Sequence, residues 1–140
     1  MRTSRNVRLG SPPEALLARL ADGRTDLVFD WVAGGRPATA TDGDGRRIVE
    51  WCAYYGDVSA VRFLLDHGES LASLGPDLGL NGAAFHGHWR LCEFVLERGA
   101  EVNREDEATG ETALHSALCT PERRAHDLVV RVLLAHGADV

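Results

Sequence analysis

Apolar residues recur along this chain at the spacing of one helix face. In one segment they fall at i, i+3, i+6 and i+7: Val58, Val61, Leu64 and Leu65. That spacing is typical of an amphipathic helix with a single buried stripe. Gly68 follows, and glycine there supplies the left-handed backbone that commonly ends a helix. Three further segments show the same pattern: 26–35, 90–99 and 128–137. The pattern therefore predicts four helices that each bury one face.

The four segments form an internal repeat. Their closing glycines, Gly35, Gly68, Gly99 and Gly137, lie 33, 31 and 38 residues apart. A period near 33 is typical of a stacked helical array, in which no unit buries its apolar face alone. A shorter segment rich in small residues precedes each: 14–22, 48–56, 81–87 and 112–119. Each unit is thus predicted to be a helix, a tight glycine turn, a second helix and a connector with turn residues.

Short motifs within this period resemble the ankyrin repeat. Residues 110–117 read GETALHSA, residues 83–88 read AAFHGH, and residues 99–103 read GAEVN. The resemblance implies an all-α solenoid of helix-turn-helix units joined by hairpin-like connectors. The expected limits are a flexible tail and four repeats: 1–11, then 12–45, 46–76, 77–109 and 110–140. In the two middle repeats the usual threonine-histidine opening is replaced by residues 47–50 (RIVE) and 78–81 (LGLN). The side-chain hydrogen bonds that this motif normally makes are therefore not predicted for these two repeats.

The resemblance also implies a concave groove lined by the first helix of each repeat. The two variable residues before each turn glycine would project into it: Tyr54 with Tyr55, Phe85 with His86, and Cys119 with Thr120. Large rigid rings with polar tips are frequent anchors of protein interfaces. The predicted partner-binding residues are Trp51, Tyr54, Tyr55, Phe85, His86 and Trp89. The alternative is that some of these rings fill space between helices.

Charge and motif content narrow the function. The chain carries 15 basic and 21 acidic residues for a net charge of −6, and every basic residue is arginine. This balance argues against binding to nucleic acid through its phosphates. The sequence lacks the motifs of nucleophilic hydrolases, zinc proteases and phosphate loops, so we expect no enzyme activity and no cofactor. An acidic third connector favours a basic protein partner: Glu101, Glu105, Asp106, Glu107 and Glu111.

A small-molecule or metal-binding protein is the alternative that the histidines and cysteines leave open. It would use His86, His88, Cys119 and His126. Zinc needs three or four ligands that converge at about 2 Å, whereas neighbouring helices pack about 8–10 Å apart, so no metal site is predicted. The resemblance to ankyrin repeats implies that His88, after the turn glycine, and His115, in the opening motif, stabilise the fold and do not bind a ligand. Three separated cysteines without a C-x-x-C motif indicate a reducing compartment rather than a disulfide framework.

The remaining expectations concern location and the carboxyl end. No segment approaches the roughly 20 apolar residues of a membrane span, so we expect a cytoplasmic protein that does not enter membranes. Abundant alanine, arginine and glycine fit a GC-rich, bacterial genome. The last repeat keeps the apolar set of an internal unit, whereas arrays generally close with a polar repeat. We therefore expect either a chain that continues past Val140, as a targeting or regulatory domain of a longer enzyme or effector, or a terminal face that packs on a partner or a second copy.

Overall fold

The computed structural model describes residues 13–41, 45–74, 78–119 and 123–139, and the predicted tail at 1–11 lies outside these ranges. Within them the chain forms helix pairs: α2 (Pro13–Ala21) with α3 (Leu27–Ala33), α4 (Ile48–Tyr54) with α5 (Val58–Leu65), α7 (Leu80–Phe85) with α8 (Trp89–Glu97), and α9 (Ala113–Leu118) with α10 (Arg123–Ala135). The described ranges contain no strand, and one isolated antiparallel bridge joins Thr41 to Arg47 in the first connector. The all-α prediction is confirmed.

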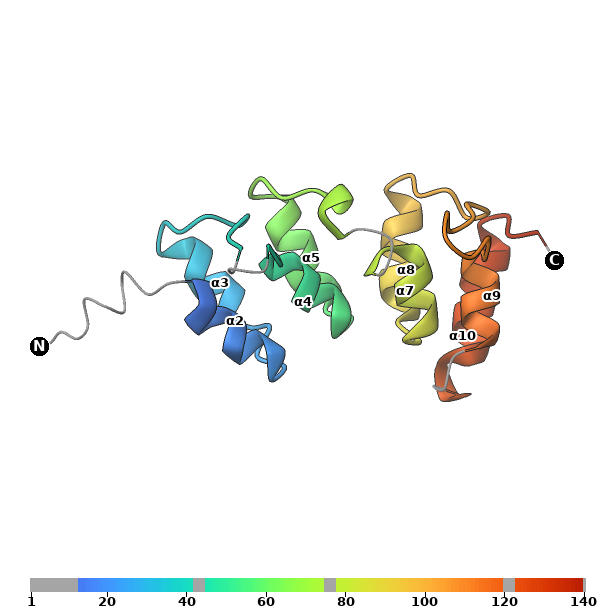
Figure 1. Cartoon of the computed structure of the whole chain (residues 1–140), viewed down its shortest axis with the longest axis horizontal. Coiled ribbons are helices and arrows are strands. Elements are labelled where there is room, and N and C mark those ends of the chain that lie inside the picture. The colour runs from blue at the N-terminus through green and yellow to red at the C-terminus, as the bar shows by residue number, and fades with distance from the viewer. Residues whose placement is uncertain (1–12, 42–44, 75–77, 120–122, 140) are drawn as a thin grey trace, which may run out of the picture.

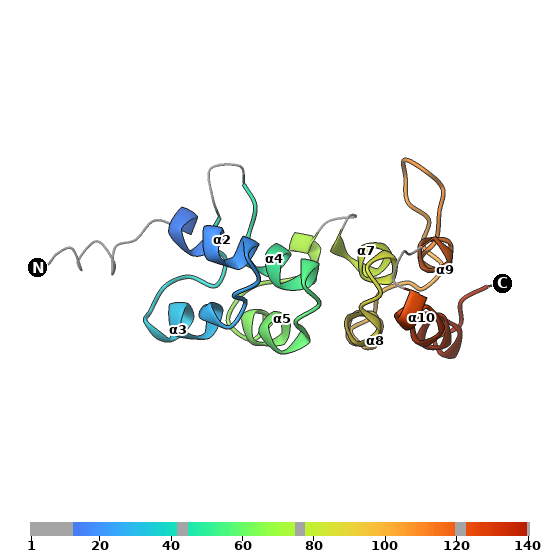
Figure 2. The same cartoon turned by 90° about the horizontal axis from the view of Figure 1, so that it is seen from below.

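The pairs follow one another along the long axis of the molecule, with α2 and α3 at one extreme and α9 and α10 at the other (Figure 1). Turned by 90°, the first helices α2, α4, α7 and α9 form one row and the second helices α3, α5, α8 and α10 form another (Figure 2). This is the solenoid that the period predicts. It places equivalent residues of successive pairs next to one another along each row.

The core runs between the two rows and between neighbouring pairs. Its fully buried side chains come from every pair and include Leu20, Val28, Ile48, Leu64, Leu91 and Leu133. Burying one such side chain contributes about 1.5–3 kcal/mol. Small buried residues occupy the positions where first helices approach each other: Cys52, Ala53, Ala83, Ala84 and Ala117. The small residues of the first-helix segments therefore set the close spacing of that row.

Side-chain hydrogen bonds close the starts of α4 and α9, although the α4 sequence departs from the ankyrin motif. In α9 the amide of Thr112 donates to His115 Nδ1 at 3.0 Å. In α4 the amide of Arg47 donates to Glu50 Oε2 at 2.6 Å, so a carboxylate takes the place of the imidazole. In the third pair, Asn81 Nδ2 donates to the carbonyl oxygen of Glu111 at 3.2 Å, which ties α7 to the connector that follows α8.

Two local features differ from the simple repeat. The second connector contains a 3-10 turn, η1 (Leu71–Leu74), which begins just after the buried Glu69. The Glu69 carboxylate accepts from the Ser70 amide at 2.9 Å, from Ser73 Oγ at 2.7 Å and from Arg47 at 3.2 Å, which satisfies its charge. The second difference is that α10 begins five residues before its predicted segment. Arginine and alanine are strong helix formers, so the residues from Arg123 to Ala125 extend the helix toward its start.

Candidate functional site

Rings from the second and third pairs form one connected network. Tyr54 meets Trp51 edge-to-face at 5.9 Å between ring centroids and meets Tyr55 at 5.1 Å. It also meets His86 of the third pair at 5.2 Å, and His86 meets Phe85 at 5.4 Å. All four contacts are edge-to-face, which is one of the favourable geometries for aromatic pairs. Five of the six sequence-predicted residues therefore lie in this ring network.

The repeat explains why these rings meet. Tyr54 is the last residue of α4 and Phe85 is the last residue of α7, so the solenoid places them at equivalent ends of neighbouring helices. Tyr54, Tyr55 and Phe85 are 43%, 40% and 41% exposed, and they lie next to one another rather than singly. Trp51 and His86 are half-buried. The network thus presents an open aromatic surface and not a closed core.

Trp89 lies apart from the network. It begins α8, in the second row of helices, and packs half-buried against the core. The guanidinium of Arg90 lies 5.0 Å from the centre of its ring. In the fourth pair, Cys119 follows α9 and is exposed, while Thr120 lies outside the described residues. The aromatic character of the surface is therefore concentrated in the second and third pairs.

His88 holds the third pair against the second. Its Nε2 donates to the carbonyl oxygen of Tyr54 at 2.8 Å, and its ring lies directly over Gly56. Gly56 has a φ of +71°, and a Cβ built there would come within 2.5 Å of His88 Nδ1. Only glycine satisfies both the left-handed backbone and the close approach of this ring. The structural role expected for His88 is thus visible as a bond between pairs.

His86 stacks on His88 with 5.8 Å between ring centroids and 27° between ring planes. Burial lowers the pKa of His86, and the neighbouring His88 lowers it further. Both causes disfavour the charged imidazolium. The imidazole that links Tyr54 to Phe85 in the ring network therefore favours its neutral form.

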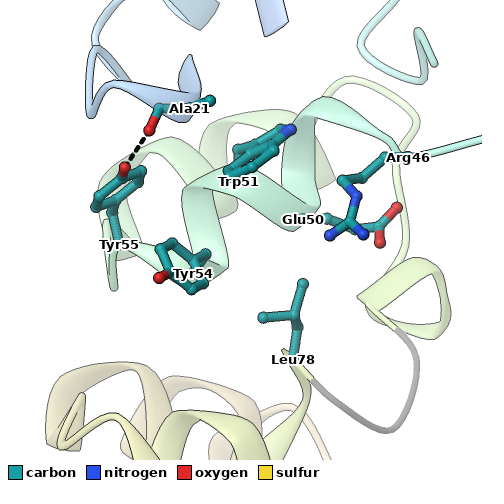
Figure 3. A pocket seen from close by; sticks show the side chains of 7 residues that line it. All are labelled: Ala21, Arg46, Glu50, Trp51, Tyr54, Tyr55 and Leu78. Carbon is teal, nitrogen blue, oxygen red and sulfur yellow. Dashed lines mark hydrogen bonds between the residues drawn. The ribbon is translucent and has the colours of Figure 1, made fainter. Parts of the chain in front are cut away.

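A hollow lies beside the network on the α4 side. Its lining residues are Ala21, Arg46, Glu50, Trp51, Tyr54, Tyr55 and Leu78, and its volume is about 270 Å³. Figure 3 shows the three rings on one side, Arg46 next to Glu50 on the other, and Leu78 beneath. The Tyr55 hydroxyl donates to the carbonyl oxygen of Ala21, which fixes the end of the hollow nearest the first pair. The hollow therefore draws on three successive repeats.

Four residues of the hollow were missed by sequence reasoning: Ala21, Arg46, Glu50 and Leu78. Leu78 stands where the ankyrin motif has threonine, and this apolar replacement was the available signal. The indole N–H of Trp51 is buried without a hydrogen-bond partner among the described residues. Figure 3 places its nitrogen on the ring edge away from Leu78, so this donor does not face the hollow.

The cysteines and histidines were considered as ligands in the alternative prediction. Across the described ranges, no three His, Cys, Asp or Glu side chains come together in a way that could hold a metal ion. Burial raises the pKa of the Cys52 thiol and of the Cys92 thiol to about 12, which makes both poor nucleophiles. Cys119 is exposed, and all three thiols are free. Within the described part of the chain, no helix has the length and apolar character needed to cross a membrane.

The last pair exposes leucines where earlier pairs are covered. Leu118 on α9 is 56% exposed, although Ala84, the equivalent residue of α7, is fully buried. Leu134 on α10 is 43% exposed, whereas the equivalent Leu96 on α8 is 8% exposed. The surface formed by Leu118 and Leu134 thus has the apolar character of a contact between repeats. We call it the terminal face.

Comparison with known proteins agrees with this architecture. The family model of the ankyrin repeat matches residues 109–140. A serine/threonine-protein kinase of Mus musculus is 33% identical over 89 residues, which is 59% of this chain and 11% of the kinase. A palmitoyltransferase of Neurospora crassa is 33% identical over 90 residues, 62% of this chain and 12% of the transferase. A ubiquitin-protein ligase of Caenorhabditis elegans is 27% identical over 103 residues, 74% of this chain and 3% of the ligase.

The matched motif and the stacked helix pairs together define the class: this is a helical repeat protein whose residues 109–140 match the ankyrin repeat. Ankyrin repeats generally mediate protein–protein interaction and are non-catalytic modules. The chain spans about a tenth of the length of the kinase and the transferase that it matches.

Proposed function

We propose that this chain is a non-catalytic module that binds a protein partner over the ring network. The observation that carries the proposal is the continuity of Trp51, Tyr54, Tyr55, His86 and Phe85 across two repeats, with three of the rings about two-fifths exposed. Aromatic residues at the centre of an interface commonly carry most of its binding free energy. A preformed surface also loses little ordering entropy when the partner binds. Trp89 is proposed as a border of this surface.

The charge of the third connector supports a basic partner. The side chains of Glu101, Glu105, Glu107 and Glu111 are exposed. Asp106 is instead used within the connector, because its Oδ1 accepts from the amides of Ala108 and Thr109 at 2.8 and 3.0 Å. The side chains of the four glutamates are therefore open to solvent, whereas the Asp106 carboxylate is bound within the turn. Opposite charges at the rim of an interface mainly raise the association rate and the salt dependence of binding.

The test is capture of a partner from a lysate of the source organism by the intact chain and by a Tyr54→Ala/Phe85→Ala variant. We expect the double variant to lose the captured protein. The matched control is Phe29→Ala/Leu128→Ala, which removes two side chains of 36% and 39% exposure from the other row of helices. The control is expected to capture the partner as the intact chain does.

The proposal fails if both variants capture the partner equally well, or if the control alone loses it. Thermal unfolding of each variant separates loss of binding from loss of fold. Truncating a fully buried aromatic costs about 3–5 kcal/mol, and a cost of that size at Tyr54 or Phe85 would mean that these rings are core. Raising the ionic strength should weaken capture if the partner is basic.

A second candidate is a targeting or regulatory domain of a longer enzyme or effector. It is favoured by the small share that the chain covers in the kinase and the palmitoyltransferase. In that case the groove would position a substrate or regulator for a separate catalytic domain. Sequencing the full-length transcript from the source organism tests this candidate, and a transcript without any catalytic domain contradicts it. The cytoplasmic location is likewise proposed, on the strength of three free thiols, and fractionation of the source cells tests it.

A further inference from the structure

We infer that the hollow beside Trp51 receives one uncharged aromatic side chain of the protein partner. This inference rests on the proposed function, because it assigns the residue class that the groove selects. It differs from that proposal in naming Arg46 and Leu78 as residues that determine specificity. Neither belongs to the ring network described above.

The size of the hollow fits one large side chain. Its volume is about 270 Å³. An apolar cavity of roughly 150 Å³ accommodates a benzene ring, and sites for drug-sized ligands enclose roughly 300–1,000 Å³. The hollow is therefore larger than a single ring requires and smaller than most small-molecule sites. An aromatic side chain with part of its backbone occupies this range.

The walls of the hollow match the faces and edges of a ring. Trp51, Tyr54 and Tyr55 already interlock edge-to-face, at 78° and 88° between successive ring planes, so they present a rigid aromatic wall. Leu78 supplies an apolar floor and is half-buried. A further ring continues the edge-to-face pattern along this wall, which adds to the burial of its apolar area. An aliphatic side chain would gain the burial alone.

The rim charges favour an uncharged occupant. The guanidinium of Arg46 lies 5.6 Å from the centre of the Trp51 ring, and the Glu50 carboxylate lies next to it. Because Arg46 and Glu50 carry opposite charges side by side, their fields largely cancel, and a charged side chain gains little attraction there to offset the loss of its hydration. A neutral ring has no charge to desolvate and gains a cation–π contact with Arg46. The rim thus selects for aromatic character as the wall does.

The experiment is selection of random 12-residue peptides, displayed on phage, against the purified chain. We expect enriched peptides to share one aromatic position, and replacing it with leucine to weaken binding about tenfold. Leu78→Arg fills the hollow and should abolish binding, whereas the control Leu128→Arg, on an outer helix, should not. Arg46→Gln should weaken binding about threefold, as expected for one cation–π contact. Its matched control is Arg98→Gln, since Arg98 lies 4.8 Å from the Phe94 ring centre away from the hollow.

The outcomes separate this inference from the proposed function. In one outcome, the enriched peptides lose binding to the Tyr54→Ala/Phe85→Ala variant but share no aromatic position and still bind the Leu78→Arg variant. The ring network then binds peptides, and the inference about the hollow is wrong. If no peptide is enriched, or if binding withstands the double alanine variant, both are overturned. Leu78→Arg is interpreted with its thermal unfolding curve. Should that variant unfold, Arg46→Gln and the aromatic-to-leucine peptides decide the result, because they leave the core intact.

Discussion

Replacing Gly56 with alanine should destabilise the stack more than the same change at any open turn. The new Cβ would lie 2.5 Å from His88 Nδ1, so the imidazole must move, and its 2.8 Å bond to the Tyr54 carbonyl oxygen is lost. A left-handed residue other than glycine costs roughly 1–2 kcal/mol, and the lost hydrogen bond adds about 1 kcal/mol. We expect a total of about 2–4 kcal/mol once the displaced ring is included.

Gly110→Ala is the matched control. Gly110 has a φ of +73°, nearly that of Gly56 at +71°, and no atom lies within 4 Å of a Cβ built there. It should therefore cost the backbone strain alone, about 1–2 kcal/mol. Urea unfolding followed by circular dichroism gives both free energies. In a His88→Ala background the penalty of Gly56→Ala should fall to that of Gly110→Ala. Equal penalties for the two glycines in the intact chain would show that His88 does not rest on Gly56 in solution.

Three further predictions concern the thiols, Trp51 and the terminal face. At pH 8 a disulfide reagent should titrate Cys119 quickly in the folded chain and all three thiols in urea. Burial raises the pKa of Cys52 and Cys92 from 9.0 to about 12, so above about pH 9 the folded chain keeps protons that the unfolded chain releases. The free energy of unfolding should therefore fall as pH rises above about 9. A single fast thiol class of three would contradict the burial. Trp51→Phe removes the unpartnered indole N–H, so unfolding in urea should show no loss beyond about 1 kcal/mol, and a loss above about 2 kcal/mol would mean that this donor is bonded in solution. We propose self-association through the terminal face, so sedimentation velocity should show dimers that form with rising concentration and that Leu118→Ser/Leu134→Ser abolishes; dimers unaffected by the variant would place the contact elsewhere.

Much of the fold could be predicted because its signals are local. The glycine period fixed the number and order of the helix pairs, and the apolar stripe of Val61 and Leu64 identified the buried face of α5. The exposed ends of α4 and α7 followed from the same period, because equivalent residues of stacked units share one surface. Tyr54 and Phe85 are both exposed at these ends, and their role in partner binding stays a prediction.

The hollow could not be predicted, because it depends on how three repeats sit against one another. Leu78 reaches it only through the orientation of the third pair relative to the second, and Ala21 enters through a backbone oxygen that sequence patterns do not reveal. The role of Glu50 was also hidden. A carboxylate accepts the Arg47 amide where the motif has histidine, since either group can supply the acceptor. Helix α10 starts early because the helix propensity of Arg123, Arg124 and Ala125 outweighs the repeat alignment.

The hydrogen bond from His88 to the carbonyl oxygen of Tyr54 holds two repeats together without using the Tyr54 side chain. The acceptor is main chain, and every amino acid carries it, so position 54 can change its side chain without releasing the third pair from the second. Lineages that carry this array are therefore free to exchange the side chain at position 54, which we propose meets the partner, while inheriting the same scaffold, and new binding preferences can arise there with little penalty in folding.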